Sequence, residues 1–134
     1  PWQTCGRHRF YLHADVLFWE CHGPMEVSEV AALFATRVAL QRQYGHALVI
    51  VDARDTDSVP PESRRYAAQL KPDPPLRGVV VVFGAGLLTR AAVSLIAGAA
   101  RLFGRGGIRT LFFTQDETQA WATLERERLA LREV

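Results

Sequence analysis

The chain has 134 residues, of which 49% are hydrophobic and 22% charged, and this suits one globular domain that buries its own core. The formal net charge is +2, and the basic residues are spread along the chain, so nucleic acid is not the expected partner. No apolar run approaches the roughly 20 residues of a membrane-spanning helix, and the start lacks a signal-peptide pattern. Since Pro1 is not a translation start, further sequence can precede it.

The first elements predicted are a β-hairpin and a long helix. Residues 9–23, RFYLHADVLFWECHG, have aromatic and β-branched residues on both sides of a turn at Ala14 and Asp15, which predicts two antiparallel strands. From about 26 to 44, apolar residues recur at helical spacing. Gly45 follows, as is typical of the residue just past a helix end.

The middle of the chain alternates between strands and helices. The run ALVIVDA at 47–53 is continuously apolar up to Asp52, which indicates a strand covered on both faces. A helix is predicted at about 61–70, opened by a proline, and the proline-rich segment KPDPPLRG at 71–78 predicts a loop. A second buried strand, GVVVVFG, and a helix at 87–104 follow.

The chain closes with a predicted strand at 108–113 and a helix at about 115–132. Thr114 and Glu117 have the spacing of a capping box at the start of that helix. The element order is therefore a hairpin followed by alternating helices and strands. It predicts an α/β fold with a mixed, mostly parallel sheet covered by helices.

Polar residues gather where the predicted strand at 47–53 gives way to a helix, which is where α/β proteins usually hold ligands or modified residues. These residues are Asp52, Asp55, Asp57, Ser58, Glu62 and Ser63. Clustered carboxylates suit a hard cation such as Mg²⁺, and DTDSV resembles the nucleophile motif of haloacid-dehalogenase-type phosphatases. Here, however, Arg54 stands where the second acid of that motif is required. The alternative is a polar turn whose acids cap the helix.

A second candidate site is the segment FGAGLLTR at 83–90. Gly84 and Gly86 lie between a strand and a helix, as in a dinucleotide-binding loop. Thr89 replaces the third glycine, so a tight turn is the simpler interpretation. The helix start beside Arg90 could still receive an anion, which makes a small-molecule sensor or carrier, with an apolar or nucleotide ligand, the alternative function.

The question of a zinc site is raised by four possible ligands near the start, Cys5, His8, Cys21 and His22. Cys21 and His22 are adjacent in a predicted strand and point to opposite faces, so they do not easily bind one ion. We therefore expect no metal and no cofactor. Two cysteines do not require a disulfide in a chain of this length, and we interpret Cys5 and Cys21 as free thiols of a cytoplasmic protein.

The span from about Phe10 to Leu124 resembles a STAS-like domain, the fold of bacterial anti-sigma-factor antagonists and of the cytoplasmic tails of sulfate transporters. The hairpin, the segments ALVIVDARD and GVVVVFG, and the closing segment LFFTQDETQAWATL carry the resemblance. It implies a single STAS-like domain over 1–134, with its core at about 9–125. It also implies a regulatory role in bacterial signalling through a protein partner, rather than an enzymatic activity.

In such antagonists, a kinase-like partner phosphorylates a serine at the helix start after the third strand, and the added charge disrupts binding. The corresponding segment here lies near residues 60–63, where prolines replace the middle of the Asp-Ser-Ser-Gly pattern. Because these prolines block the usual serine-bearing turn, we expect Ser58 to be solvent-exposed and a better phosphate acceptor than Ser63. Residues 52–63 form the expected docking surface.

The predicted helix at 87–104 also suggests an interface. We expect one stripe to face the sheet, and it consists of Leu88, Ala92, Leu95, Ala99 and Leu102. The opposite line, flanked by Val93 and Ala100, consists of Arg90, Ser94, Ala97 and Arg101. Small residues between two arginines resemble an interface core and rim, which predicts a homodimer through residues 90–101. The alternative is that surface alanines simply favour a helix.

Overall fold

The computed structural model describes residues 1–102 and 110–132, without the side chains of residue 97 and of residues 99–102. In chain order, its elements are β1 (Gln3–Cys5), β2 (His8–His13), β3 (Val16–His22), α1 (Val27–Tyr44), β4 (Ala47–Asp55), α2 (Pro61–Gln69), β5 (Gly78–Phe83), α3 (Leu87–Leu102), β6 (Leu111–Thr114) and α4 (Glu117–Arg132). The predicted hairpin and the alternation that follows it are both confirmed. The ends of the predicted helix and strand at 103–104 and 108–109 lie outside the described residues.

One six-stranded sheet, in the order β1-β2-β3-β4-β5-β6, organises the molecule. The first three strands pair antiparallel, and the pairs β3–β4, β4–β5 and β5–β6 are parallel. The chain therefore has the predicted α/β fold with a mixed sheet and an N-terminal hairpin. The sequence did not predict β1, because three residues are too few to show the alternation of a strand.

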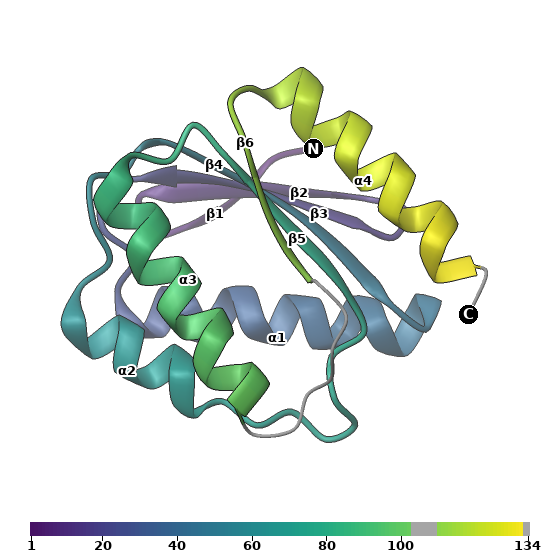
Figure 1. The fold of residues 1–134 in the computed structure, drawn as a ribbon, viewed down its shortest axis with the longest axis horizontal. Helices are drawn as coiled ribbons and strands as arrows, with labels where there is room; N and C mark the ends of the chain where they lie inside the picture. Colours follow the sequence, from purple (N-terminus) through teal and green to yellow (C-terminus); the bar gives the residue numbers. More distant parts are fainter. Residues whose placement is uncertain (103–109, 133–134) are drawn as a thin grey trace.

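Helices cover both faces of the sheet, with α4 on one face and α1, α2 and α3 on the other (Figure 1). The core on the α4 side is formed by Val16, Phe18, Leu48, Ile50, Val79, Val81, Phe83, Ala120 and Leu124. The core on the other side is formed by Leu17, Trp19, Cys21, Leu40, Ala47 and Val49. Successive residues of the central strands thus enter opposite cores, which explains why β5 and the first residues of β3 and β4 are continuously apolar.

The hairpin turn is tied to distant parts of the chain by Asp15. Its Oδ1 accepts a hydrogen bond from Arg128 of α4 at 2.7 Å, and its Oδ2 lies 2.7 Å from Nε2 of His46, next to β4. Burial raises the pKa of Asp15, but the hydrogen bonds from Arg128 and His46 outweigh it, and the pKa lies below its ordinary value. The carboxylate therefore holds three segments of the chain together in its charged form.

The predicted capping box at the start of α4 is wrong. Thr114 is the last residue of β6 and pairs with Phe83 of β5, so it belongs to the sheet. The helix begins at Glu117, and Asp116 caps it by accepting a hydrogen bond from the backbone N–H of Gln119 at 2.8 Å. The strand continues one residue further than its apolar pattern shows, to Thr114, and the residue that caps the helix lies two positions later than predicted, at Asp116.

The rotation of α3 also differs from the prediction. Leu88 and Leu95, expected to face the sheet, are 72% and 69% exposed, and Leu87 is 84% exposed. Thr89 is buried although it lies outside the predicted stripe, whereas the burial of Ala92 agrees with the prediction. Because α3 lies beside β6 at the edge of the sheet and packs chiefly against α2, its buried side is not the apolar stripe that a central helix would need. Among the described helices, none is long and apolar enough to cross a membrane.

Candidate functional site

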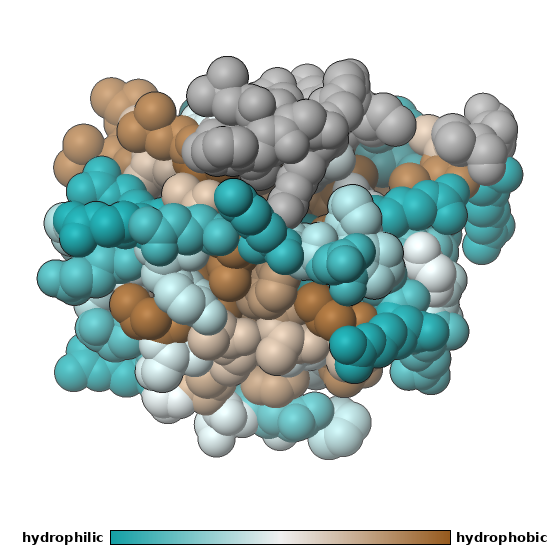
Figure 2. Space-filling view, turned by 90° about the horizontal axis from the view of Figure 1, so that it is seen from below, coloured by the Kyte–Doolittle hydropathy of each residue, from teal (hydrophilic) through white to brown (hydrophobic). Residues whose placement is uncertain are grey.

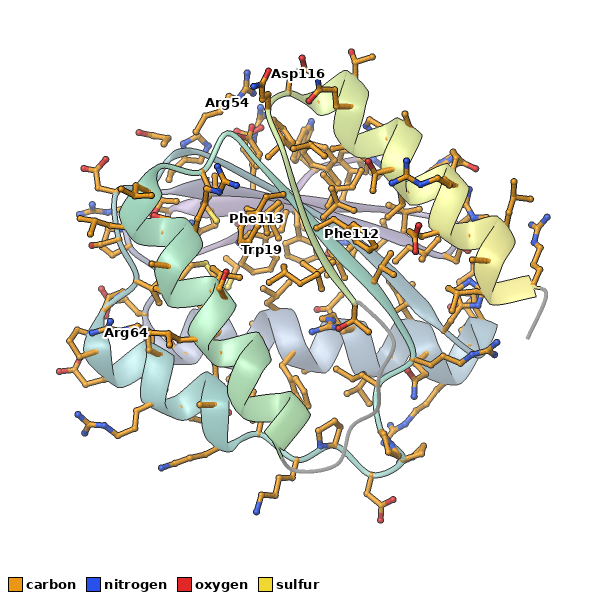
Figure 3. All side chains as sticks on the ribbon, in the orientation of Figure 1. Trp19, Arg54, Arg64, Phe112, Phe113 and Asp116 are labelled. Carbon is orange, nitrogen blue, oxygen red and sulfur yellow. The ribbon has the colours of Figure 1, made fainter. Side chains whose placement is uncertain are left out.

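The ends of β4, β5 and β6 meet at one edge of the sheet, as parallel pairing requires. Figure 3 shows Arg54 and Asp116 together at this edge, whereas Arg64 of α2 lies away from it. Most of the polar residues that the sequence analysis selected follow these strand ends. This edge is therefore the candidate site.

Asp52 is not available to a metal ion or to a partner. It is 4% exposed, and its carboxylate accepts hydrogen bonds from Nε and Nη2 of Arg54 at 3.0 and 2.7 Å and from the Arg54 backbone N–H at 3.1 Å. The hydrogen bond to Asp52 raises the pKa of Arg54. The guanidinium group, which is itself exposed, also lies over the ring of Phe83. The arrangement is a satisfied ion pair that closes the end of β4.

Asp55 belongs to a second ionic cluster, which the sequence analysis missed. His22 lies between two carboxylates, with Nδ1 2.9 Å from Oδ2 of Asp55 and Nε2 2.6 Å from Oε1 of Glu20. Arg9 donates two further hydrogen bonds to Glu20. The hydrogen bonds with Asp55 and then Glu20 raise the pKa of His22. His22 and Asp55 are partners in the parallel β3–β4 pair, so only the strand register could have revealed this cluster.

The loop between β4 and α2 presents its polar residues to solvent. Asp57, Ser58 and Glu62 are exposed, which confirms the predicted exposure of Ser58. Ser63 is only 1% exposed, and its hydroxyl donates a hydrogen bond of 2.6 Å to the carbonyl oxygen of Met25. Ser63 is thus buried rather than part of a docking surface, because the first turn of α2 turns it inward.

The glycine segment after β5 forms a tight turn. Gly84 has a φ of 73°, and a side chain there would overlap Arg54, whereas the space around Gly86 is open. An open hollow of about 820 Å³ lies beside this turn, and Arg90 and Arg126 are among the residues that line it. Within the predicted ligand segment, Arg90 therefore reaches a hollow that could admit an anion.

Thr89 joins the two candidate segments. It is buried, and its hydroxyl donates a weak hydrogen bond of 3.5 Å to the carbonyl oxygen of Thr56. This contact holds the start of α3 against the loop after β4, so that exposed polar and exposed apolar side chains share one region. We call this region the loop–α3 surface; it comprises Asp57, Ser58, Leu87 and Leu88. In the upper left of Figure 2, strongly apolar side chains are visible at the end of the molecule where α3 begins.

The cysteine and histidine residues considered as zinc ligands have other contacts in the structure. His8 is buried, with Nε2 3.0 Å from a carboxylate oxygen of Glu29 and Nδ1 accepting a hydrogen bond from the backbone N–H of His22. Cys5 and Cys21 are free thiols, as predicted, and burial raises the pKa of Cys21 to about 12. Within residues 1–102 and 110–132, no group of three potential ligands could hold a metal ion.

Comparison with known proteins adds no family to these observations. No model of a known protein family matches the chain, and no match is found among curated proteins.

Proposed function

We propose that this chain is a non-enzymatic regulatory domain that binds a protein partner through the loop–α3 surface. The STAS-like resemblance of the sequence supports this role and suggests a cytoplasmic signalling protein of bacteria. The α/β fold with its N-terminal hairpin is compatible with that resemblance. The proposed surface differs from the one predicted from the sequence. It includes Leu87 and Leu88 at the start of α3, and it leaves out the predicted residues Asp52, Asp55, Glu62 and Ser63.

The observation that carries the proposal is the exposure of Leu87 and Leu88, at 84% and 72%. Single exposed leucines are common on protein surfaces, but these two are adjacent and lie next to the polar loop that contains Asp57 and Ser58. An apolar centre beside a polar margin is the usual anatomy of a protein interface. Complete burial of one leucine contributes about 1.5 to 3 kcal/mol, so the pair offers a partner a substantial gain.

The chemistry of the surface suggests how binding would be controlled. A phosphate on Ser58 would add about −1.5 to −2 charges directly beside Asp57. A partner that buries the leucines against this loop would then meet repulsion and a desolvation cost. The expected partner therefore has an apolar patch flanked by basic side chains, as a kinase-like anti-sigma factor or sensor could have.

The test is a binding titration with kinase-like proteins encoded near this chain, followed by matched variants. Leu88→Asp is expected to weaken binding at least tenfold, the change typical of an interface residue with a large contribution. Leu129→Asp is the control, because Leu129 is 59% exposed but lies on α4, over the other face of the sheet. Equal effects of the two variants would contradict the proposed surface.

Phosphorylation is tested separately by mass spectrometry after incubation with the partner. We expect modification at Ser58 and reduced binding of Ser58→Asp, while Ser58→Ala binds normally. Modification at Ser63 alone would refute the choice of serine, since that hydroxyl is buried.

A small-molecule sensor is the second candidate function. The hollow beside Gly84 that Arg90 and Arg126 line favours it, because two cations can attract an anionic ligand. If the hollow binds such a ligand, titration with a nucleoside diphosphate should shift the NMR signals of the backbone amides of Gly84 and Gly86. Unchanged amide signals at millimolar nucleotide would exclude it.

The homodimer through residues 90–101 stays a prediction. Arg90 and Ser94 are exposed, whereas the side chains of Ala97 and Arg101 lie outside the described part of the chain. Sedimentation of the wild type and of Ala97→Glu would decide it, with a dimer expected for the first and a monomer for the second.

A further inference from the structure

A cavity of about 280 Å³ lies between the sheet and the helices α1, α2 and α3, away from the site described above. It arises because α2 packs mainly against α1 and α3 and not over the middle of the sheet. Apolar side chains from α1, α2, β5, α3 and β6 dominate its lining, among them Val30, Leu33, Phe34, Val80, Val93 and Ile96. In Figure 2, apolar side chains also gather in the middle of this face, between polar margins.

Arg37 of α1 is the one charged residue among the described residues that line the cavity. Its Nε is buried and has no hydrogen-bond partner among the described residues. Burial lowers the pKa of Arg37 to about 10, so the guanidinium group remains protonated at neutral pH. A buried donor of a charged group that has no partner is unfavourable, and an anion in the cavity would supply that partner.

We propose that this cavity binds a single-chain amphipathic carboxylate, of the class of medium-chain fatty acids, with its carboxylate on Arg37 and its chain along the apolar lining. A guanidinium group presents a planar fork of donors that matches a carboxylate. One buried cation balances one negative charge, whereas a phosphate monoester would bring an excess of charge into the cavity.

The volume and the lining set the size and kind of the ligand. An apolar cavity of about 150 Å³ can hold benzene, so a cavity of 280 Å³ has room for roughly ten to twelve non-hydrogen atoms, as in octanoate or decanoate. A nucleotide is larger and needs several hydrogen-bonding groups, but apart from Arg37 the polar side chain in the described lining is that of Thr110. The lining includes no residue of the loop–α3 surface, so the two proposals are independent.

Isothermal titration of the purified chain with sodium decanoate tests the proposal. We expect decanoate to bind the wild type, and 1-decanol, which has the same chain without the charge, to bind roughly 10- to 100-fold more weakly, the usual effect of a charged hydrogen bond. Arg37→Met is expected to weaken decanoate binding by a similar factor. Arg42→Met is the matched control, because Arg42 lies on the same helix but is exposed. This variant should bind decanoate with the affinity of the wild type.

A cavity-filling variant tests the location. Ala67 of α2 lines the cavity, and Ala67→Phe is expected to abolish decanoate binding while the far-ultraviolet circular dichroism remains that of the folded chain. The proposal is overturned if the wild type does not bind decanoate at 1 mM, if decanol binds as tightly as decanoate, or if folded Arg37→Met binds like the wild type. The comparison of decanoate with decanol uses the wild-type chain alone, so it decides the role of charge even if a variant fails to fold.

Discussion

Replacing Arg37 by methionine is expected to stabilise the ligand-free protein, although most core substitutions destabilise. The side chain of Arg37 lines an apolar cavity, and its Nε is buried without a hydrogen-bond partner. Methionine keeps a flexible chain that can fill the same space, and its helix propensity is close to that of arginine. The substitution thus removes an unpaired charge and leaves the rest of α1 as it is.

The size of the effect follows from the unsatisfied donor. Leaving a buried polar group without a partner costs about 1 to 3 kcal/mol, and more when the group is charged. Because Arg37 as a whole is half-buried, we do not add the larger cost of a fully buried charge, and we expect a gain of about 1 to 3 kcal/mol. For a chain of this size, that corresponds to an increase in Tm of roughly 3 to 12 °C.

Thermal and urea unfolding, followed by circular dichroism, measure the change in the free energy of unfolding. Arg42→Met again serves as the control, with an expected change within about 0.5 kcal/mol because the residue is exposed. A loss of stability in Arg37→Met would refute the reasoning. It would mean that the guanidinium group contributes to the folded state through a favourable interaction.

Three further predictions concern the fold. Asp15→Asn should lower the free energy of unfolding by about 2 kcal/mol, since it weakens charged hydrogen bonds such as that from Arg128. The pKa of Asp15 is lowered from its ordinary value of 3.8. The wild type should therefore lose this stabilisation only as the pH falls below about 3.8. The raised pKa of His22 predicts that this residue stabilises the folded state fully below about pH 6.5 and that the stabilisation is lost as the pH rises further. Between about pH 6 and 8, the Tm of the wild type should therefore fall more than the Tm of His22→Gln. Gly78→Ala should cost about 2 kcal/mol or more in urea unfolding, because Gly78 has a φ of 141° and a side chain there would overlap the carbonyl of Ala47. Equal stability of Asp15→Asn, parallel pH curves for the histidine variant, or an unchanged midpoint for Gly78→Ala would contradict the respective argument.

Local patterns in the sequence were sufficient to predict most of the elements. The hairpin turn at Ala14 and Asp15, the helix end at Gly45 and the helix start at Pro61 depend on residues within a few positions of each other, and the structure confirms each of them. The buried strands were equally clear, because a strand that enters two cores is apolar throughout. The short β1 carried too little pattern to be recognised.

The orientation of side chains could not be predicted where a helix meets an unusual neighbour. Helical spacing shows which residues of α3 share a face, but not which face is buried. Leu88 and Leu95 are exposed because α3 lies at the edge of the sheet and packs chiefly against α2. Ser63 is buried for a comparable reason, since its hydroxyl reaches the backbone of Met25 across the fold.

The difference between local and tertiary information is clearest at Arg37. The helical spacing of apolar residues was sufficient to predict that a helix spans this residue. In that sequence Arg37 is one of fifteen arginines, with no pattern that distinguishes it. Its burial beside an apolar cavity exists only because α2 packs against α1 and α3, which leaves space under β5. Side chains from segments far apart in the chain create that environment, so only the tertiary structure could show that the Nε of Arg37 is buried without a hydrogen-bond partner among the described residues.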